Sequence, residues 1–452
     1  MSKRTFEFFS FYDSAGMERR MEDMAKQGWL PEKMGSLFWH WKSMEPQNLH
    51  FSVTYFADAS EFDPRPTEEQ EIFAEFCARS GWTLLLRSGQ MQVFTSDREN
   101  PLPIETDAAV QVETVHKTMK KSVLATQLVM LALCLWQLVF SWLRFDNDPV
   151  GFLSSPSSLC MVPAWLLLLA ECLCELGFYL RWYRRAKRLA AETGEFLRIK
   201  TSRWMSLVLL IAAALIMLAG IFSSAVALGG ILLWFALMPL LFLCANGVKR
   251  FMKRHQFSRR TNRFITLSSV AVITIAAMML LGIFIIRFDG FDTKKAIGTY
   301  NHHGFEMKIY DDPLPLTVEE LTGAEGLWSK EERGQSSFLL ANRDYHQDSI
   351  PSGNNDAPGL SYTIIEVKAP FLYELCLAQL LTEDEDFPEE YRDYYKAVDA
   401  APWQANAAYR KHSHDGTTYR RHVLCYDNRI VIIVPDWELT HEQMSLVGKK
   451  LG

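Results

Sequence analysis

The sequence predicts a membrane protein in which a block of transmembrane helices separates two folded α+β domains. Between residues 122 and 286, long apolar runs such as SVLATQLVMLALCLWQLVFSWL alternate with short basic stretches. The net charge of this block is +10, whereas it is −5 over residues 1–121 and −11 over residues 287–452. Direct nucleic-acid binding by the acidic domains is not expected, because such binding depends on lysine and arginine neutralising phosphates.

The first predicted domain, residues 1–105, contains the same pattern twice: a helix, Gly-Trp, a strand, a turn and an aromatic strand. Gly28-Trp29 and Gly81-Trp82 occupy equivalent positions in the two copies. Glycine accepts the left-handed conformation that ends a helix, and the tryptophan then starts a strand and covers the core. We expect a cytoplasmic α+β domain, ferredoxin-like or a duplicated variant, with two helices on one face. A ligand-binding box formed by the tryptophans is the functional alternative.

The segments FFSFYD, MERRMEDMAKQGW, LFWHWKSM, FSVTYF and EFCARSGW carry a resemblance to a known family. Over residues 1–105 the chain resembles the bacterial domain-of-unknown-function family 2812. The resemblance implies a multi-pass membrane protein, as in many members, with a gene for a PadR-like winged-helix regulator nearby. The family has no established catalytic residues to carry over.

Residues 106–121 are expected to form an irregular linker that becomes basic just before the membrane. An apolar helix needs about 20 residues to cross the hydrocarbon core. The run 205–248 is long enough for a hairpin of two helices, with a turn at Ser223-Ser224 to Gly229-Gly230. The sequence therefore predicts five spans, at about 122–143, 159–180, 205–223, 228–248 and 264–286. The opening MSKRTFEFFSFYD lacks a signal peptide's apolar core, so we expect the first span to direct insertion.

The distribution of lysine and arginine predicts which way the protein faces. Loop 181–203 carries eight basic residues and loop 249–263 carries seven, whereas loop 144–158 has only Arg144. Basic loops stay on the cytoplasmic side of a membrane. We therefore expect a multi-pass protein of the cell membrane with a cytoplasmic N-terminus and an extracytoplasmic C-terminus.

Glu171 and Glu175 lie four residues apart inside the second predicted span. Ionisable groups at such depth are costly and often functional, for example in proton or cation sensing. The structural alternative is that Glu175 lies near the cytoplasmic end and that Glu171 is protonated or hydrogen-bonded between helices.

The last predicted domain, residues 287–452, has the composition of a soluble α+β domain. The segments FEMKIY, LSYTIIEVKA, TYRRHVLCY and RIVIIV are strand candidates, which predicts a sheet of at least four strands. Asp427-Asn428 is a hairpin signal between the last two of these strands. The cysteines Cys376 and Cys425 could pair if this domain lies outside the cell. Six histidines (His302, His303, His346, His412, His414 and His422) raise the alternative of a metal site, but they are scattered.

No motif for a cofactor, a metal site or catalysis was found, and the chemistry of the chain stays open. The first hypothesis is a membrane regulator or sensor whose outer domain is coupled to a cytoplasmic partner such as a PadR-like regulator. The second is a transport or export component that uses the intramembrane carboxylates. The third is an extracytoplasmic enzyme. Membrane lipid is an expected partner in all three.

Overall fold

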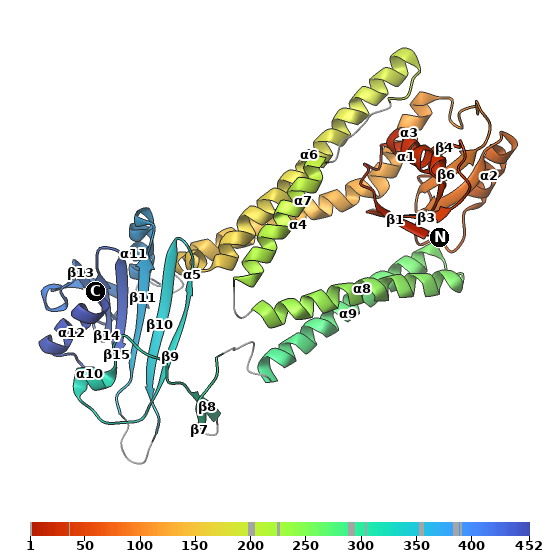
Figure 1. Ribbon diagram of the computed structural model, residues 1–452. Helices are drawn as coiled ribbons and strands as arrows, with labels where there is room; N and C mark the ends of the chain where they lie inside the picture. The colour runs from red at the N-terminus through yellow and green to blue at the C-terminus, as the bar shows by residue number, and fades with distance from the viewer. Residues whose placement is uncertain are drawn as a thin grey trace. The chain divides into compact units, whose positions relative to one another are not determined.

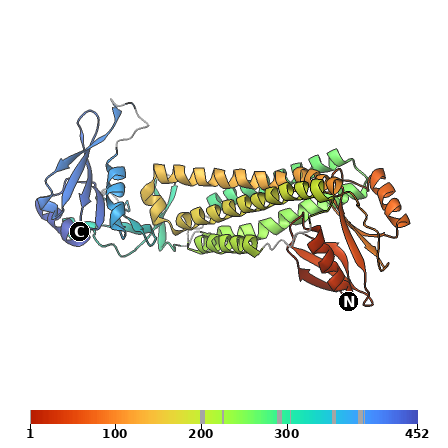
Figure 2. The ribbon, with the colours of Figure 1, turned by 90° about the horizontal axis from the view of Figure 1, so that it is seen from above.

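The computed structural model of the chain (Figures 1 and 2) describes residues 2–35, 37–197, 204–223, 227–287, 294–302, 305–351, 357–382, 388 and 391–452. The chain divides into two compact units. One unit comprises Met1–Gln137, Ala164–Leu215 and Gly229–Gly290, and the other comprises Leu138–Pro163, Ile216–Leu228 and Phe291–Gly452.

Residues 2–96 form two successive β-α-β-β units, in agreement with the repeat predicted from the sequence. The first contains β1 (Ser2–Phe6), α1 (Ser14–Lys26), β2 (Trp29–Met34) and β3 (Phe38–Ser43), and the second contains β4 (His50–Tyr55), α2 (Glu68–Arg79), β5 (Thr83–Ser88) and β6 (Met91–Ser96). The strand orders β1-β3-β2 and β4-β6-β5 are equivalent, and every pairing is antiparallel. The duplicated alternative therefore describes this domain better than one continuous ferredoxin-like sheet.

Side-chain caps set the start of both helices. The carboxylate of Asp13 accepts the backbone N–H of Gly16 at 2.9 Å, and Thr67 forms a reciprocal capping box with Gln70. The expectation of two helices on one face is wrong. Val93 of β6 packs in the large core with α1, whereas Phe94 packs in a small core with α2. Because successive strand residues point to opposite faces, α1 and α2 cover opposite faces of the second sheet.

The predicted linker at 106–121 is also wrong for most of its length, because residues 108–121 form helix α3 (Ala108–Lys121). Asp107 caps its first turn by accepting the backbone N–H of Ala109 at 2.8 Å. Val112, Val115 and Met119 are buried in the core of the first domain. Their spacing of three and four residues places them on one helical face, which the many polar neighbours concealed in the sequence.

Each of the five predicted spans overlaps a long helix. These are α4 (Val123–Asn147), α6 (Pro156–Thr193), α7 (Trp204–Phe222), α8 (Ala227–Arg254) and α9 (Arg259–Arg287). Within the described chain, four helical stretches are long and apolar enough to cross a membrane: Ala108–Asn147, Pro156–Thr193, Trp204–Phe222 and Arg259–Leu280. They expose large apolar side chains such as Trp136, Leu215 and Val272, as expected of a surface that faces lipid. The predicted hairpin turn falls partly on residues 224–226, outside the described chain.

The C-terminal domain is built on a seven-stranded antiparallel sheet, which agrees with the prediction of at least four strands. The sheet order is β12-β13-β14-β15-β11-β10-β9. Its strands are β9 (Trp328–Ser336), β10 (Leu340–Ser349), β11 (Leu360–Val367), β12 (Tyr394–Val398), β13 (Ala407–His412), β14 (Thr418–Cys425) and β15 (Arg429–Pro435). The predicted strand FEMKIY instead forms β8 (Phe305–Ile309), which pairs with β7 (Gly298–His302) in a separate hairpin. The predicted turn at Asp427-Asn428 joins β14 and β15 as expected.

Helices cover both faces of this sheet. One face packs against α10 (Val318–Thr322) and α12 (His441–Leu451). The other face packs against α11 (Tyr373–Leu381) and α5 (Pro149–Ser154), the short helix between α4 and α6. Val431 belongs to the first core and Ile432 to the second, as strand alternation requires. The connection between two predicted spans is thus part of the C-terminal domain's core.

Candidate functional site

A cavity of about 850 Å³ lies where the N-terminal domain meets the first turns of α4 and α9 and the middle of α6. Its volume is in the range of small-molecule sites. Its walls combine apolar side chains, such as Met91 and Leu267, with charged ones, such as Lys121 and Arg263. The cavity can therefore accommodate an amphipathic ligand.

Of the two carboxylates predicted as intramembrane candidates, only Glu175 borders this cavity. Its Oε1 accepts a hydrogen bond from the Ser206 hydroxyl of α7 at 2.7 Å. Glu171 is buried one turn earlier on α6 and hydrogen-bonds with Cys172. The two side chains therefore have different surroundings, and both have hydrogen-bond partners.

Basic residues of α8 and α9 hold the acidic loop that follows β4. Lys249 forms an ion pair with Glu61 at 2.8 Å, and Arg259 donates to the backbone carbonyl of Asp58, also at 2.8 Å. Asn262 donates to the carbonyl of Phe62 at 2.8 Å. The predicted basic loop 249–263 thus fastens the N-terminal domain to the helix ends.

Several polar groups at the cavity have no partner within the described chain. Arg263 is exposed and makes no ion pair or hydrogen bond with any described residue. The Ser10 hydroxyl and the Gln90 Oε1 atom are buried without a hydrogen bond to the described chain. Unsatisfied buried polar atoms cost free energy, so these groups are available to a polar ligand or to water.

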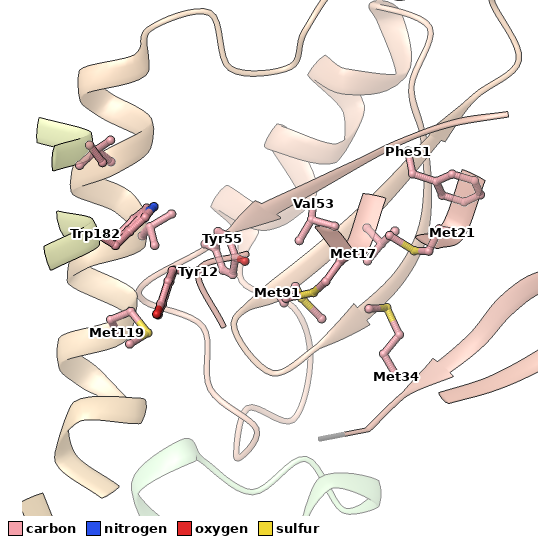
Figure 3. Packing of buried hydrophobic residues seen from close by; sticks show 14 of the residues in the cluster. Tyr12, Met17, Met21, Met34, Phe51, Val53, Tyr55, Met91, Met119 and Trp182 are labelled. Carbon is pink, nitrogen blue, oxygen red and sulfur yellow. The ribbon is translucent and has the colours of Figure 1, made fainter. Parts of the chain in front are cut away.

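The second half of α6 enters the core of the N-terminal domain. Figure 3 shows Trp182 beside Tyr12, whose rings stack at 4.9 Å, with Met119 of α3 close by. The hydroxyl of Tyr179 and the Nδ1 atom of His116 lie 2.6 Å apart. This contact was not predicted, because the eight basic residues of 181–203 indicated a loop. Trp182, Ala186 and Ala190, spaced by four, form a buried stripe between the arginines and could have revealed it.

The surroundings of the two Gly-Trp motifs show that these residues end helices and pack in the domain cores. Gly28 and Gly81 have φ values of 82° and 88°, the left-handed conformation expected after each helix. Trp82 is buried, and its indole N–H donates to the Leu102 carbonyl at 2.7 Å. Trp29 is half-buried and packs against the large core, whereas Trp82 belongs to the small one. The two tryptophans therefore do not form a shared aromatic box.

A second cavity of about 800 Å³ lies in the N-terminal domain between α1, β4 and the segment before α3. Five carboxylates line it: Glu18, Glu22, Glu99, Glu105 and Glu195. Burial raises the pKa of Glu105 to about 7. His50 lies 3.5 Å from Glu22 at the same cavity. Glu105 can therefore hold a proton near neutral pH.

In the described part of the C-terminal domain, the histidines and cysteines form no recognisable site. Over the described residues, no group of three or more His, Cys, Asp or Glu side chains could hold a metal ion. His422 is buried against Trp403, and burial lowers its pKa. Cys376 and Cys425 are both free thiols, so the pairing considered from their positions is not present. His303 lies outside the described chain.

Comparison with known proteins finds one family that the first domain resembles. The sequence profile of the family described as "Protein of unknown function (DUF2812)" matches residues 13–127. The match confirms the resemblance drawn from the residues and extends beyond residue 105 through α3. No curated protein and no solved structure matches the chain.

Proposed function

Residues 13–127 of the chain match the profile of the DUF2812 family, and with that match in hand we propose that the protein is a membrane-embedded regulator or sensor. In this proposal the C-terminal domain responds to a condition or ligand outside the cell. Helices α4 and α6 carry the response to the N-terminal domain, which acts on a cytoplasmic partner such as a PadR-like transcriptional regulator.

The observation that carries the proposal is that α4 and α6 each contribute to the hydrophobic cores of both folded domains. On α4, Val123 packs against the N-terminal core and Phe145 against the C-terminal core. On α6, Leu159 packs against the C-terminal core and Trp182 is buried in the N-terminal one. A helix packed into a core at each end can transmit a displacement, because close-packed cores resist gradual deformation.

The proposed topology has five spans, a cytoplasmic N-terminal domain and an extracytoplasmic C-terminal domain. The contacts of each unit support it. The basic residues Lys249 and Arg259 contact the N-terminal domain, as expected if both are cytoplasmic. The connection with few basic residues between α4 and α6 packs instead on the C-terminal domain.

The transport alternative rests on Glu171 and Glu175. Each has a hydrogen-bond partner within the protein, which is the pattern of a carboxylate that serves helix packing. We therefore retain the regulator as the proposed function.

Hydrogen exchange of the full chain in lipid nanodiscs tests the coupling. The Ser337 hydroxyl donates to the Leu153 carbonyl of α5 at 2.6 Å. Ser337→Ala removes this bond and the bonds that the same hydroxyl accepts from the Leu339 and Leu340 N–H groups. The expected loss of at least about 1 kcal/mol raises local exchange about fivefold or more. If the helices couple the domains, exchange also rises in α3, at 108–121.

Ser361→Ala is the matched control. The Ser361 hydroxyl also makes a hydrogen bond, to the His346 side chain of the same sheet at 3.1 Å, but Ser361 lies away from α5. The control should change exchange only near β10 and β11. Exchange in α3 that is identical in wild type and Ser337→Ala would contradict the coupling.

A further inference from the structure

Phe371 and Phe338 are 79% and 77% exposed, more than any other large apolar side chain in the described part of the chain. They exceed even the lipid-facing residues of the spans, such as Phe264 at 72%. Phe338 is a central residue of the turn between β9 and β10, which the Ser337 N–H closes by donating to the Leu340 carbonyl at 2.9 Å. Such turn positions normally hold Gly, Asn or Asp. The apolar residue at this tip needs another explanation.

The two phenylalanines belong to one surface. The backbone N–H groups of Lys368 and Ala369 donate to the Leu339 carbonyl at 3.0 and 3.2 Å. The Lys368 ammonium also donates to the Ser337 carbonyl at 2.6 Å. Leu375 lies one helical turn after Phe371 and is exposed as well. We call Phe338, Phe371 and Leu375 the aromatic tip.

The base of the aromatic tip rests on the connection between α4 and α6. Ser337 donates to the Leu153 carbonyl of α5. Phe152 and Leu153 share a core with Leu372, the residue after Phe371. The tip is therefore anchored to a segment that directly joins two helices able to cross a membrane.

The residue at which α4 ends indicates how deep the connection between α4 and α6 lies in the bilayer. The predicted span ends at residue 143 and α4 ends at Asn147, which is about 6 Å further along the helix axis. This distance matches the thickness of the headgroup region on one side of a bilayer. Trp142 is exposed there, and ring contacts continue from Trp142 to Phe145 at 6.0 Å and to Phe152 at 5.7 Å. Exposed tryptophan at a span end is typical of the membrane interface.

From these contacts we infer that the aromatic tip is a membrane-insertion surface, by which the C-terminal domain dips into the lipid headgroup region beside α4 and α6. Phenylalanine and leucine enter the acyl boundary, and the Lys368 side chain lies at headgroup level, where a cation is favourable. This surface would fix the domain's orientation on the bilayer. The inference requires that α4 and α6 span the membrane, but not that the protein is a regulator.

Site-specific photo-crosslinking in nanodiscs of phosphatidylethanolamine and phosphatidylglycerol tests the inference. The full chain carries p-benzoylphenylalanine in place of Phe338 or Phe371, and lipid adducts are measured by mass spectrometry. Tyr419 is the matched control, because it is exposed near the first residue of β14. The turn that contacts Val367 follows the last residue of the same strand, so Tyr419 lies at the opposite end. We expect at least about tenfold more lipid adduct at the tip than at Tyr419, the occupancy ratio that burial of one phenylalanine supplies.

The photo-reactive residue in place of Val272, an exposed residue of α9, separates the two possible failures. If the Val272 position forms lipid adducts but positions 338 and 371 do not, the insertion surface is overturned. If position 272 also forms none, membrane insertion of the helices fails and the inference falls with it. Crosslinks from the tip to a second protein chain instead of to lipid would likewise overturn it. A Phe338→Ser and Phe371→Ser double variant that is folded but gives the same nanodisc orientation as wild type would also count against it.

Discussion

The hydroxyl oxygen of Tyr179 lies 2.6 Å from the Nδ1 atom of His116, which joins α6 directly to α3. The ring of His116 also stacks on Tyr183 at 4.1 Å. A helix that is long and apolar enough to cross a membrane is thereby linked to the helix that leads out of the N-terminal domain. In the proposed coupling, this contact is the route by which a displacement of α6 reaches that domain.

The substitution Tyr179→Phe removes the hydroxyl and keeps the ring. We expect a loss of about 0.5–1.5 kcal/mol of stability, the usual net value of one hydrogen bond. Thermal unfolding of the full chain in nanodiscs, followed by intrinsic fluorescence, measures the change. Tyr183→Phe is the control, because Tyr183 contacts His116 through its ring. Equal effects of the two variants would show that the hydroxyl contact contributes nothing.

Trp182→Ala tests whether α6 belongs to the core of the N-terminal domain. Trp182 is 2% exposed and stacks on Tyr12. Removing a buried tryptophan leaves a cavity and costs about 3–5 kcal/mol. We expect limited proteolysis to cut the N-terminal domain of this variant faster than that of the wild type. Leu102→Ala, at an exposed position, should leave the proteolysis rate unchanged. If the proteolysis rate of Trp182→Ala equals that of the wild type, α6 does not stabilise the core of the N-terminal domain.

Glu105 should make stability depend on pH. Burial raises its pKa from 4.5 to about 7. Between these values the unfolded chain has lost the proton while the folded chain keeps it, so stability falls as pH rises and levels off above about 7. The full difference corresponds to roughly 3 kcal/mol. Glu105→Gln should therefore stabilise the protein at pH 8 and have little effect at pH 4.5.

The unfolding midpoint between pH 4.5 and 8 measures this effect. Glu99→Gln, an exposed carboxylate at the same cavity, is the matched control and should keep the pH dependence of the wild type. A Glu105→Gln variant whose midpoint follows pH as the wild type does would show that another group is responsible.

The proposed partner should contact the outward face of α2. Ile72 and Phe76 are exposed there, four residues apart, while Phe73 packs inward against Phe94. Exposed apolar pairs of this kind are common at protein interfaces. If the partner is a PadR-like regulator encoded nearby, the Ile72→Ser and Phe76→Ser double variant should recover at least about fivefold less of it on co-purification.

The control for this experiment changes the same helix without removing apolar area, through Glu71→Ser and Glu75→Ser. It should leave recovery of the regulator almost unchanged. If wild type recovers no regulator, the proposed partner is wrong. If both double variants lose it equally, the apolar pair is not the contact.

Several features of the fold could be predicted because a single strong local signal produced each of them. The Gly-Trp repeats revealed the duplication, since glycine ends both helices with a positive φ. The apolar runs located the long helices. The hairpin at Asp427-Asn428 followed from turn preferences.

Other features depend on tertiary packing, which a local pattern does not show. The buried face of α3 has only Val112, Val115 and Met119 among polar neighbours, and the arginines of α6 conceal Trp182. The strands β9 and β10 are rich in charged residues, because β9 is an edge strand of the sheet and both strands have exposed positions. The cavity joins residues more than 200 positions apart, so Glu175 could be proposed but its neighbours could not.

The central claim is that common helices hold two different domains on opposite faces of one membrane. Reporter fusions to Met1 and to Gly452 of the full chain, compared in living cells, test it most directly. We predict that a reporter active only in the cytoplasm works at Met1 and fails at Gly452, whereas a reporter active only after export does the reverse. Activity of the same reporter at both ends would mean an even number of crossings and would contradict the account.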